Sequence, residues 1–130
     1  MYTDFYQFSE KPFEDNPDPI FLYSTASYQE ILVSILRWIK EDHAFAVITG
    51  EPGVGKTFFI HTLVSRLDEK IAPIFVPNPI ITFRDLLRQI LLVLKQPSRE
   101  EMETALFDRF TGVLDQMMAQ DKTLLIILDE

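Results

Sequence analysis

The sequence predicts an α/β fold in which helices cover both faces of a parallel sheet. Short apolar runs alternate along the chain with amphipathic stretches, a glycine-rich segment follows the first run, and the last run ends in two carboxylates. Strands that are separated by helices need crossover connections, which make neighbouring strands parallel. The expected order is helix, strand, helix, strand, helix, helix, strand, arranged in three layers.

Composition narrows the class of protein. The chain has 130 residues, of which 47% are hydrophobic and 25% are charged, so it is globular and not disordered. Its formal net charge of −8 argues against a broad nucleic-acid surface, and the absence of cysteine excludes disulfides and thiolate metal sites. No apolar run reaches the length of a membrane span, and no signal-peptide pattern is visible. These features predict a cytoplasmic domain.

Aromatic residues and prolines dominate residues 1–24. The prolines prevent a long helix there, and the aromatic rings need an apolar surface to pack on. We therefore expect an ordered arm over residues 1–24 that lies across a domain formed by residues 25–130.

Four helices are expected, over residues 27–41, about 55–67, 82–95 and 99–119. Each shows an apolar stripe at helical spacing. Capping patterns predict three of the helix starts: Ser27 with Glu30, Thr82, and Ser98 with Glu101.

Three strands are expected, over residues 44–49, Ile71–Val76 and Leu124–Leu128. The first is apolar throughout, which is typical of a parallel strand buried on both faces. Pro73 cannot donate a ladder hydrogen bond, so the second strand should lie at an edge of the sheet.

The segment Gly50–Thr57 matches the phosphate-loop pattern G-x-x-x-x-G-K-[ST] and stands between an expected strand and an expected helix. Such a loop turns successive backbone N–H groups toward a polyphosphate, which requires conformations that Gly53 and Gly55 can adopt. The following helix directs its positive end to the same phosphates. A glycine-rich turn with an incidental lysine is the alternative.

Each residue of the pattern has an expected role. Gly50 turns the chain off the strand, Lys56 reaches the β- and γ-phosphates, and the Thr57 hydroxyl binds Mg²⁺. The nucleotide-binding candidates are Gly50, Glu51, Pro52, Gly53, Val54, Gly55, Lys56, Thr57 and Phe58. The sequence therefore predicts a P-loop NTPase fold.

Two carboxylates, Asp129 and Glu130, end the last expected strand. Ligands of open α/β sheets bind at this edge, so Asp129 can hold the Mg²⁺ that Thr57 also contacts, as a Walker B aspartate does. Glu130 can hold the attacking water as general base, which makes Lys56 and Glu130 the catalytic candidates. A strand that simply ends in solvated acids is the alternative. A Glu directly after the Asp favours ATP over GTP, whose switch proteins carry a D-x-x-G pattern.

The N-terminal arm adds a resemblance to a known family. Its motifs are Tyr2-Thr3-Asp4-Phe5-Tyr6 with Phe8, Lys11-Pro12-Phe13, Pro17-Asp18-Pro19 and Phe21-Leu22-Tyr23. Together with Gly50–Thr57, Pro77-Asn78-Pro79 and Leu124–Glu130, they resemble the general secretion pathway protein A family of AAA+ ATPases, over essentially the whole chain. One departure is Tyr28, which stands where the family often has a histidine.

The resemblance implies an ATP- and Mg²⁺-dependent ATPase of secretin or pilus-type assembly that self-oligomerises and acts with a membrane-associated secretion partner. It also implies contact of Phe21, Leu22 and Tyr23 with adenine, for which plain packing of the arm is the alternative. The family's module needs roughly 200 residues or more. We therefore expect residues 1–130 to stop after the Walker B strand, without the sensor, arginine-finger, lid or inner-membrane regions.

Two other functions remain open at this stage. A helper ATPase of DNA transposition or replication shares the same motifs, although the charge of −8 weighs against nucleic acid. A nucleotide-gated adaptor would bind ATP with negligible turnover. With half of the module missing, we expect residues 1–130 alone to bind ATP or ADP weakly, to hydrolyse ATP poorly, and to self-associate through an open sheet edge.

Overall fold

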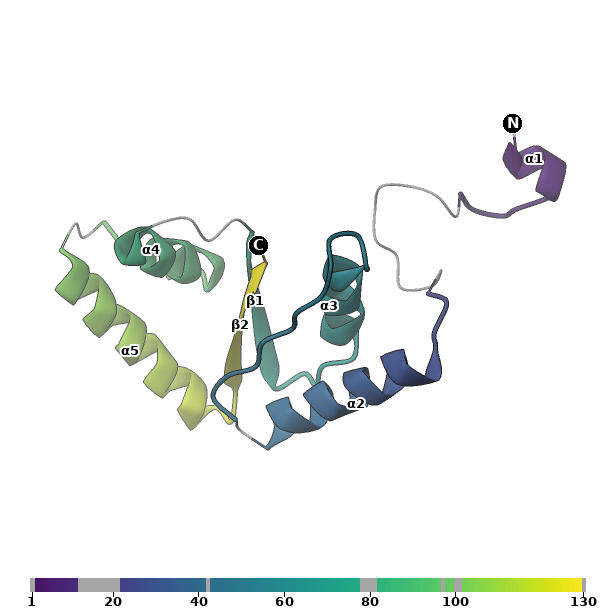
Figure 1. The fold of residues 1–130 in the computed structure, drawn as a ribbon. Coiled ribbons are helices and arrows are strands. Elements are labelled where there is room, and N and C mark those ends of the chain that lie inside the picture. The colour runs from purple at the N-terminus through teal and green to yellow at the C-terminus, as the bar shows by residue number, and fades with distance from the viewer. Residues whose placement is uncertain are drawn as a thin grey trace. The chain divides into compact units, whose positions relative to one another are not determined.

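The computed structural model describes residues 2–11, 22–41, 43–77, 82–96, 98–99 and 102–129. The helices in these ranges are α1 (Tyr2–Tyr6), α2 (Ala26–Lys40), α3 (Lys56–Ser65), α4 (Phe83–Val93) and α5 (Glu103–Ala119). The strands are β1 (Ile71–Pro77) and β2 (Thr123–Asp129). The chain forms two compact units, Met1–Leu67 and Asp68–Glu130 (Figure 1).

Helices α2 and α3 build the core of the first unit. Leu32 of α2 is completely buried and packs with Phe59 and Leu63 of α3. The ring of Tyr28 meets that of Phe59 edge to face, with centroids 5.1 Å apart. Residues four apart lie on one side of a helix, so Tyr28 and Leu32 line the same contact, as do Phe59 and Leu63.

The start of α2 differs from the expectation. Thr25, and not Ser27, caps the helix, because its side-chain oxygen accepts a hydrogen bond of 3.2 Å from the backbone N–H of Tyr28. Thr25 has the extended backbone that a capping residue needs, and Ser27 already lies inside the helix.

In the second unit, the predicted start of one helix is confirmed and that of the other is wrong. Thr82 caps α4 as predicted, accepting from the N–H of Asp85 at 3.2 Å. Helix α5 begins at Glu103, after a cap residue, Met102, that makes no side-chain hydrogen bond, so the start predicted from Ser98 is wrong.

Among the residues described above, no helix combines the length and hydropathy that crossing a membrane requires.

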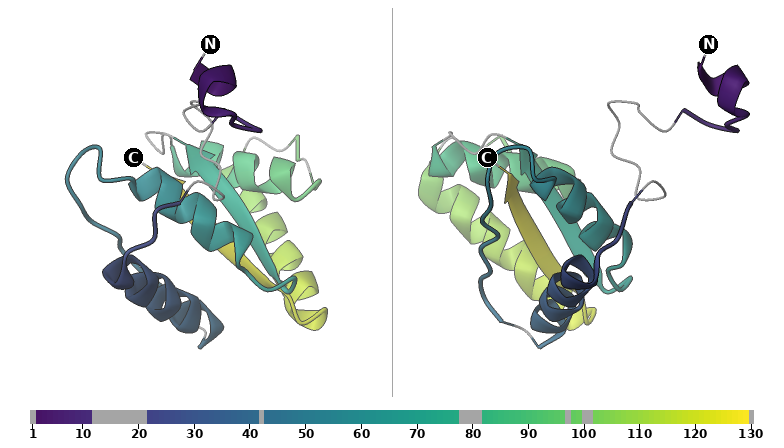
Figure 2. Two further views of the ribbon diagram at one scale, coloured as in Figure 1. Left: turned by 90° about the vertical axis from the view of Figure 1, so that its right-hand side faces the viewer. Right: turned by 45° about the vertical axis from the view of Figure 1, so that its right-hand side comes forward.

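The strand predicted over residues 44–49 is not formed. No arrow is drawn between α2 and α3 in Figure 2, and Phe45 and Val47 are 76% and 67% exposed where burial on both faces was expected. A strand exists only when it pairs with another. The described part of the first unit contains no second strand for this segment to join.

Three aromatic residues in and after α1 contact one another. In and after α1, Phe5 meets Tyr6 edge to face and Tyr6 stacks on Phe8, but all three side chains remain exposed. The packing of an arm over residues 1–24 across the domain stays a prediction. Phe13 and Phe21 lie outside the described residues.

The second unit is built on a parallel pair of strands. β1 and β2 pair so that Ile71 lies opposite Thr123 and Pro77 opposite Asp129. The strands predicted over Ile71–Val76 and Leu124–Leu128 are thereby confirmed, and α4 and α5 lie on one side of the pair (Figure 1). Ile74 and Val76 of β1 are almost completely buried against α4.

Alternation along the strands separates two faces of this pair. Ile74, Val76 and Leu124 belong to the cluster that packs on α4 and α5. Since successive side chains of a strand point to opposite faces, Ile127 and Asp129 lie on the face away from these helices.

Two prolines define one edge of β1. The backbone N–H of Thr123 donates to the carbonyl of Lys70 at 2.9 Å, so Lys70 turns its carbonyl toward β2. Backbone groups alternate in direction along a parallel ladder, which turns Pro73 and Pro77 to the opposite edge. Neither proline removes a hydrogen bond from the pair, as the edge position predicted for Pro73 requires.

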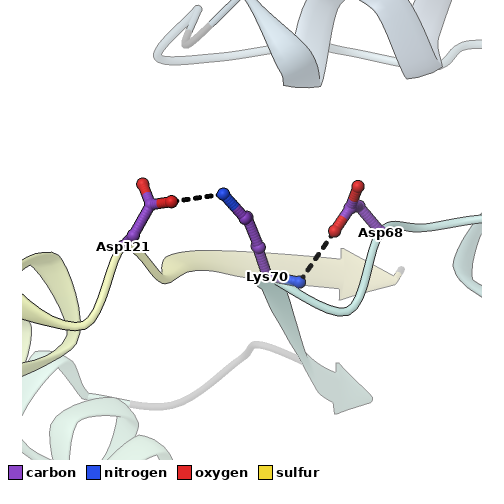
Figure 3. Close-up of polar contacts among 3 residues, drawn as sticks. All are labelled: Asp68, Lys70 and Asp121. Carbon is purple, nitrogen blue, oxygen red and sulfur yellow. Dashed lines mark hydrogen bonds and ion pairs between the residues drawn. The ribbon is translucent and has the colours of Figure 1, made fainter.

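Charged residues gather where β1 and β2 begin. The ammonium of Lys70 pairs with the carboxylate of Asp121, and the backbone N–H of Lys70 donates to Asp68 at 3.0 Å (Figure 3). Hydrogen bonding to Asp121, and then the negative charges of Asp121 and Asp68, raise the pKa of Lys70 above its ordinary value.

Tyr28→Phe is expected to raise the free energy of unfolding by about 1 kcal/mol, because a buried hydroxyl without a partner costs its desolvation. Among the described atoms the Tyr28 hydroxyl is buried and has no hydrogen-bond partner. Chemical denaturation measures the change, and Tyr23→Phe, at a side chain that is 90% exposed, is the control. A clear loss of stability in Tyr28→Phe would contradict the prediction.

The pairing of Lys70 gives a prediction for alkaline pH. A pKa that is higher in the folded than in the unfolded chain means that the pair stabilises the fold fully below the unfolded pKa, near 10.5, and loses this effect as the pH rises through the folded pKa. NMR titration of the Lys70 side-chain amine should therefore give a higher pKa in the folded chain than in the chain unfolded by urea. Equal pKa values of Lys70 in the folded and the unfolded chain would contradict it.

Candidate functional site

Two glycines of the segment before α3 have backbones that other residues rarely adopt. Gly53 has φ of 82° and Gly55 has φ of 88°, both in the left-handed region. A Cβ at either position would meet no atom within 4 Å, so backbone strain, and not crowding, is what requires glycine. The sequence-based expectation for these two residues is confirmed in its conformational part.

Gly50 lies close to the side chain of Val54. A Cβ at this residue would lie 3.0 Å from Cγ2 of Val54, a contact that forces one of them to move. The chain bends back between them, since the N–H of Val54 approaches the carbonyl of Glu51 at 3.4 Å. This close approach within the loop favours glycine over residues that have a Cβ.

Lys56 joins the two ends of the loop. Its Nζ donates to the carbonyls of Gly50 and Glu51, both at 2.8 Å. An ammonium has three N–H donors, so one remains for an external acceptor. The sequence predicted only a phosphate partner for Lys56, and no sequence signal could have revealed these contacts because both acceptors are backbone atoms.

Helix α3 begins directly after the loop and has no side-chain cap. Its N-cap residue is Gly55, which offers no side-chain acceptor. The first turn of a helix presents N–H groups without intrahelical acceptors, and the helix dipole adds positive potential there. A helix start of this kind favours an anion. Phe59 and Leu63 anchor the helix to α2 and thereby fix its direction.

Thr57 and Phe58 stand in this first turn. Thr57 is exposed, while Phe58 is partly buried and its carbonyl accepts from the hydroxyl of Thr62 at 3.0 Å. The structure thus brings all the loop candidates, from Gly50 to Phe58, into one continuous turn and helix start.

The acidic candidates belong to the other unit. Asp129 is the last residue of β2 and is partly buried, whereas Glu130 lies outside the described residues. Thr57 and Asp129, the two predicted Mg²⁺ ligands, therefore belong to different units. A hydroxyl and a carboxylate oxygen are both ligands that Mg²⁺ accepts, and this ion usually keeps several waters besides one or two protein ligands.

No other metal site is visible in the described ranges, where no group of three or more His, Asp or Glu side chains gathers. His43 contacts Trp38, with ring centroids 4.2 Å apart, and Glu41 at 3.3 Å, and it is exposed. These contacts are those of a surface histidine at the end of α2.

The adenine candidates remain predictions. Phe21 lies outside the described residues, Leu22 is partly buried, and Tyr23 is exposed. Leu22 and Tyr23 belong to the same unit as the loop.

Comparison with known proteins identifies the family to which the chain belongs. The family model described as AAA domain matches residues 39–130. General secretion pathway protein A of Aeromonas hydrophila is 31% identical over 131 residues, which cover 100% of this chain and 24% of that protein. The chain thus spans about a quarter of the length of this relative. No solved structure matches the chain significantly. Since the match covers most of the chain and includes the loop and β2, the chain belongs to the AAA domain family.

Proposed function

We propose that residues 50–57 bind the β- and γ-phosphates of ATP. The observation that carries this proposal is the conformation of the loop, in which Gly53 and Gly55 have positive φ immediately before the uncapped start of α3. Backbone N–H groups, the helix dipole and the remaining N–H of Lys56 would then all act on the same anion. Membership of the AAA domain family agrees with this assignment.

Hydrolysis would also need the groups predicted to bind Mg²⁺ and to activate the attacking water. Thr57 and Asp129 would hold Mg²⁺, either directly or through its waters, and the ion would neutralise charge on the phosphates. Glu130 would orient and deprotonate the attacking water. These roles make the protein an ATPase in which Lys56 and Glu130 are the catalytic residues.

The cellular role that fits best is in a bacterial secretion pathway. Its support is the name of the relative that is 31% identical over this whole chain. We expect the intact protein to self-oligomerise and to act with a membrane-associated partner of the secretion machinery. Because the chain covers 24% of that relative, these partners belong to the proposal for the whole protein.

Lys56→Ala should weaken ATP binding by about 100-fold or more, because it removes a charge-assisted hydrogen bond to phosphate and also the two bonds that tie Gly50 and Glu51. Titration calorimetry on the intact protein measures the affinity. Lys40→Ala, which removes an exposed lysine from the last turn of α2, is the matched control and should bind as the parent does. Unchanged affinity in Lys56→Ala would refute the loop assignment.

Glu130→Gln and Asp129→Asn should separate two steps of the reaction. Glu130→Gln is expected to retain MgATP binding and to lower turnover by about 100-fold or more, since general-base catalysis contributes a factor of this order. Asp129→Asn should reduce the response of turnover to Mg²⁺ and leave metal-free nucleotide binding unchanged. Measuring kcat over a range of Mg²⁺ concentrations tests both, and unchanged turnover in Glu130→Gln would exclude it as the base.

A further inference from the structure

The sequence of β2 does not specify how it pairs with β1. Its central residues are Leu124-Leu125-Ile126-Ile127-Leu128. A slip by one residue toward Asp129 replaces Leu by Leu and Ile by Ile on the face that packs on α4 and α5, and exchanges Leu and Ile on the other face. Register is strongly specified only where the two faces of a strand differ. Leu128, where the slip would bring Asp129, is 54% exposed, so burial at that position discriminates weakly.

The choice of register nevertheless decides where Asp129 lies. In the observed pairing Asp129 is opposite Pro77 and on the face away from α4 and α5. A slip by one residue would turn every side chain of β2 to the other face. The carboxylate would then lie on the side of the sheet that packs on these helices.

Polar contacts at the start of the strands are sensitive to this choice. Lys70 makes two contacts there: its carbonyl accepts from the N–H of Thr123, the first residue of β2, at 2.9 Å, and its ammonium pairs with Asp121 in the turn before β2 (Figure 3). A slip would displace both partners along β2 at once. The side chain of Asp68 accepts from the backbone N–H of Lys70 at 3.0 Å and thereby holds the backbone of Lys70 in place.

The backbone of Asp121 supports a specific role for its side chain. The N–H of Lys122 donates to Met117 and that of Asp121 to Met118, at 2.9 and 3.0 Å, which is the Schellman pattern at the end of α5. Asp121 has φ of 56°, at the position in this motif that glycine usually occupies. An Asp here costs stability that glycine would not, and in exchange it provides the carboxylate that Lys70 contacts.

We propose that the Lys70–Asp121 pair is a register lock that positions Asp129 on its face of the sheet. The two residues act through β2 and touch no substrate, so they are positioning residues for the metal role of Asp129, and this part of the inference rests on the proposed function. The lock itself is a statement about strand pairing and can be tested without nucleotide.

The first test reads the register by disulfide trapping in the intact protein. Residues 1–130 contain no cysteine. Any native cysteine elsewhere in the intact protein is replaced first. Phe75→Cys with Ile127→Cys reports the observed pairing, and Phe75→Cys with Leu128→Cys reports the pairing slipped by one residue. Asp121→Asn, Asp121→Gly and Lys70→Met are then introduced into both backgrounds.

Loss of the lock should raise the ratio of slipped to observed disulfide by about two- to fivefold, the range expected for an exposed ion pair. Lys70→Arg should preserve the parent ratio, because it keeps a charged donor. Lys122→Met is the matched control, since its side chain makes no ion pair with any described residue. Asp121→Gly is the most informative variant, because relief of the positive φ should maintain its melting temperature while the lock is lost.

The second test reads the position of Asp129. ATP affinity in EDTA should match the parent in the lock variants, while the response of turnover to Mg²⁺ should fall, which a general loss of folding would not produce. An unchanged disulfide ratio in both Asp121→Gly and Lys70→Met would overturn the lock. A changed ratio with an unchanged Mg²⁺ response would leave the lock standing and overturn the metal role of Asp129.

Discussion

The loop before α3 depends on two successive departures of the backbone into the left-handed region, at Gly53 and Gly55. They let the chain fold back tightly enough for Lys56 to reach the carbonyls of Gly50 and Glu51, and they start a helix that has no side-chain cap. An uncapped helix start is normally a defect. Here the same feature provides amides and positive potential for an anion, so the requirement for glycine and the capacity to bind phosphate have one origin.

Features that arise from neighbours in the chain were predictable from the sequence. Thr82 caps α4 because its own extended backbone and the N–H of Asp85 suffice, and β1 and β2 follow from short apolar runs bounded by turns. The positive φ of Gly53 and Gly55 follows from the loop pattern. In each case the deciding interaction lies within a few residues, where a single sequence contains all the information.

Features that depend on distant or backbone partners were not predictable. Residues 44–49 have the apolar character of a buried strand, but a strand also needs a partner, and composition does not reveal whether one is present. Ser98 and Glu101 form a capping pattern, yet α5 begins at Glu103, since a pattern shows that a cap is possible and not that the chain uses it. The two Lys56 contacts and the ion pair of Lys70 also escape sequence inspection, because both depend on how the chain folds back on itself.

The two prolines of β1 have a consequence for how the sheet can grow. Pro73 and Pro77 remove N–H donors from the edge of β1 that faces away from β2. A further strand, whether from this polypeptide or another molecule, would find two missing hydrogen bonds on that side. Growth is therefore favoured beside β2, where Leu124 and Ile126 retain their donors. Fibrils add strands at both edges of a sheet. Pro73 and Pro77 disfavour such addition at the free edge of β1 and leave the pairing of β1 with β2 intact.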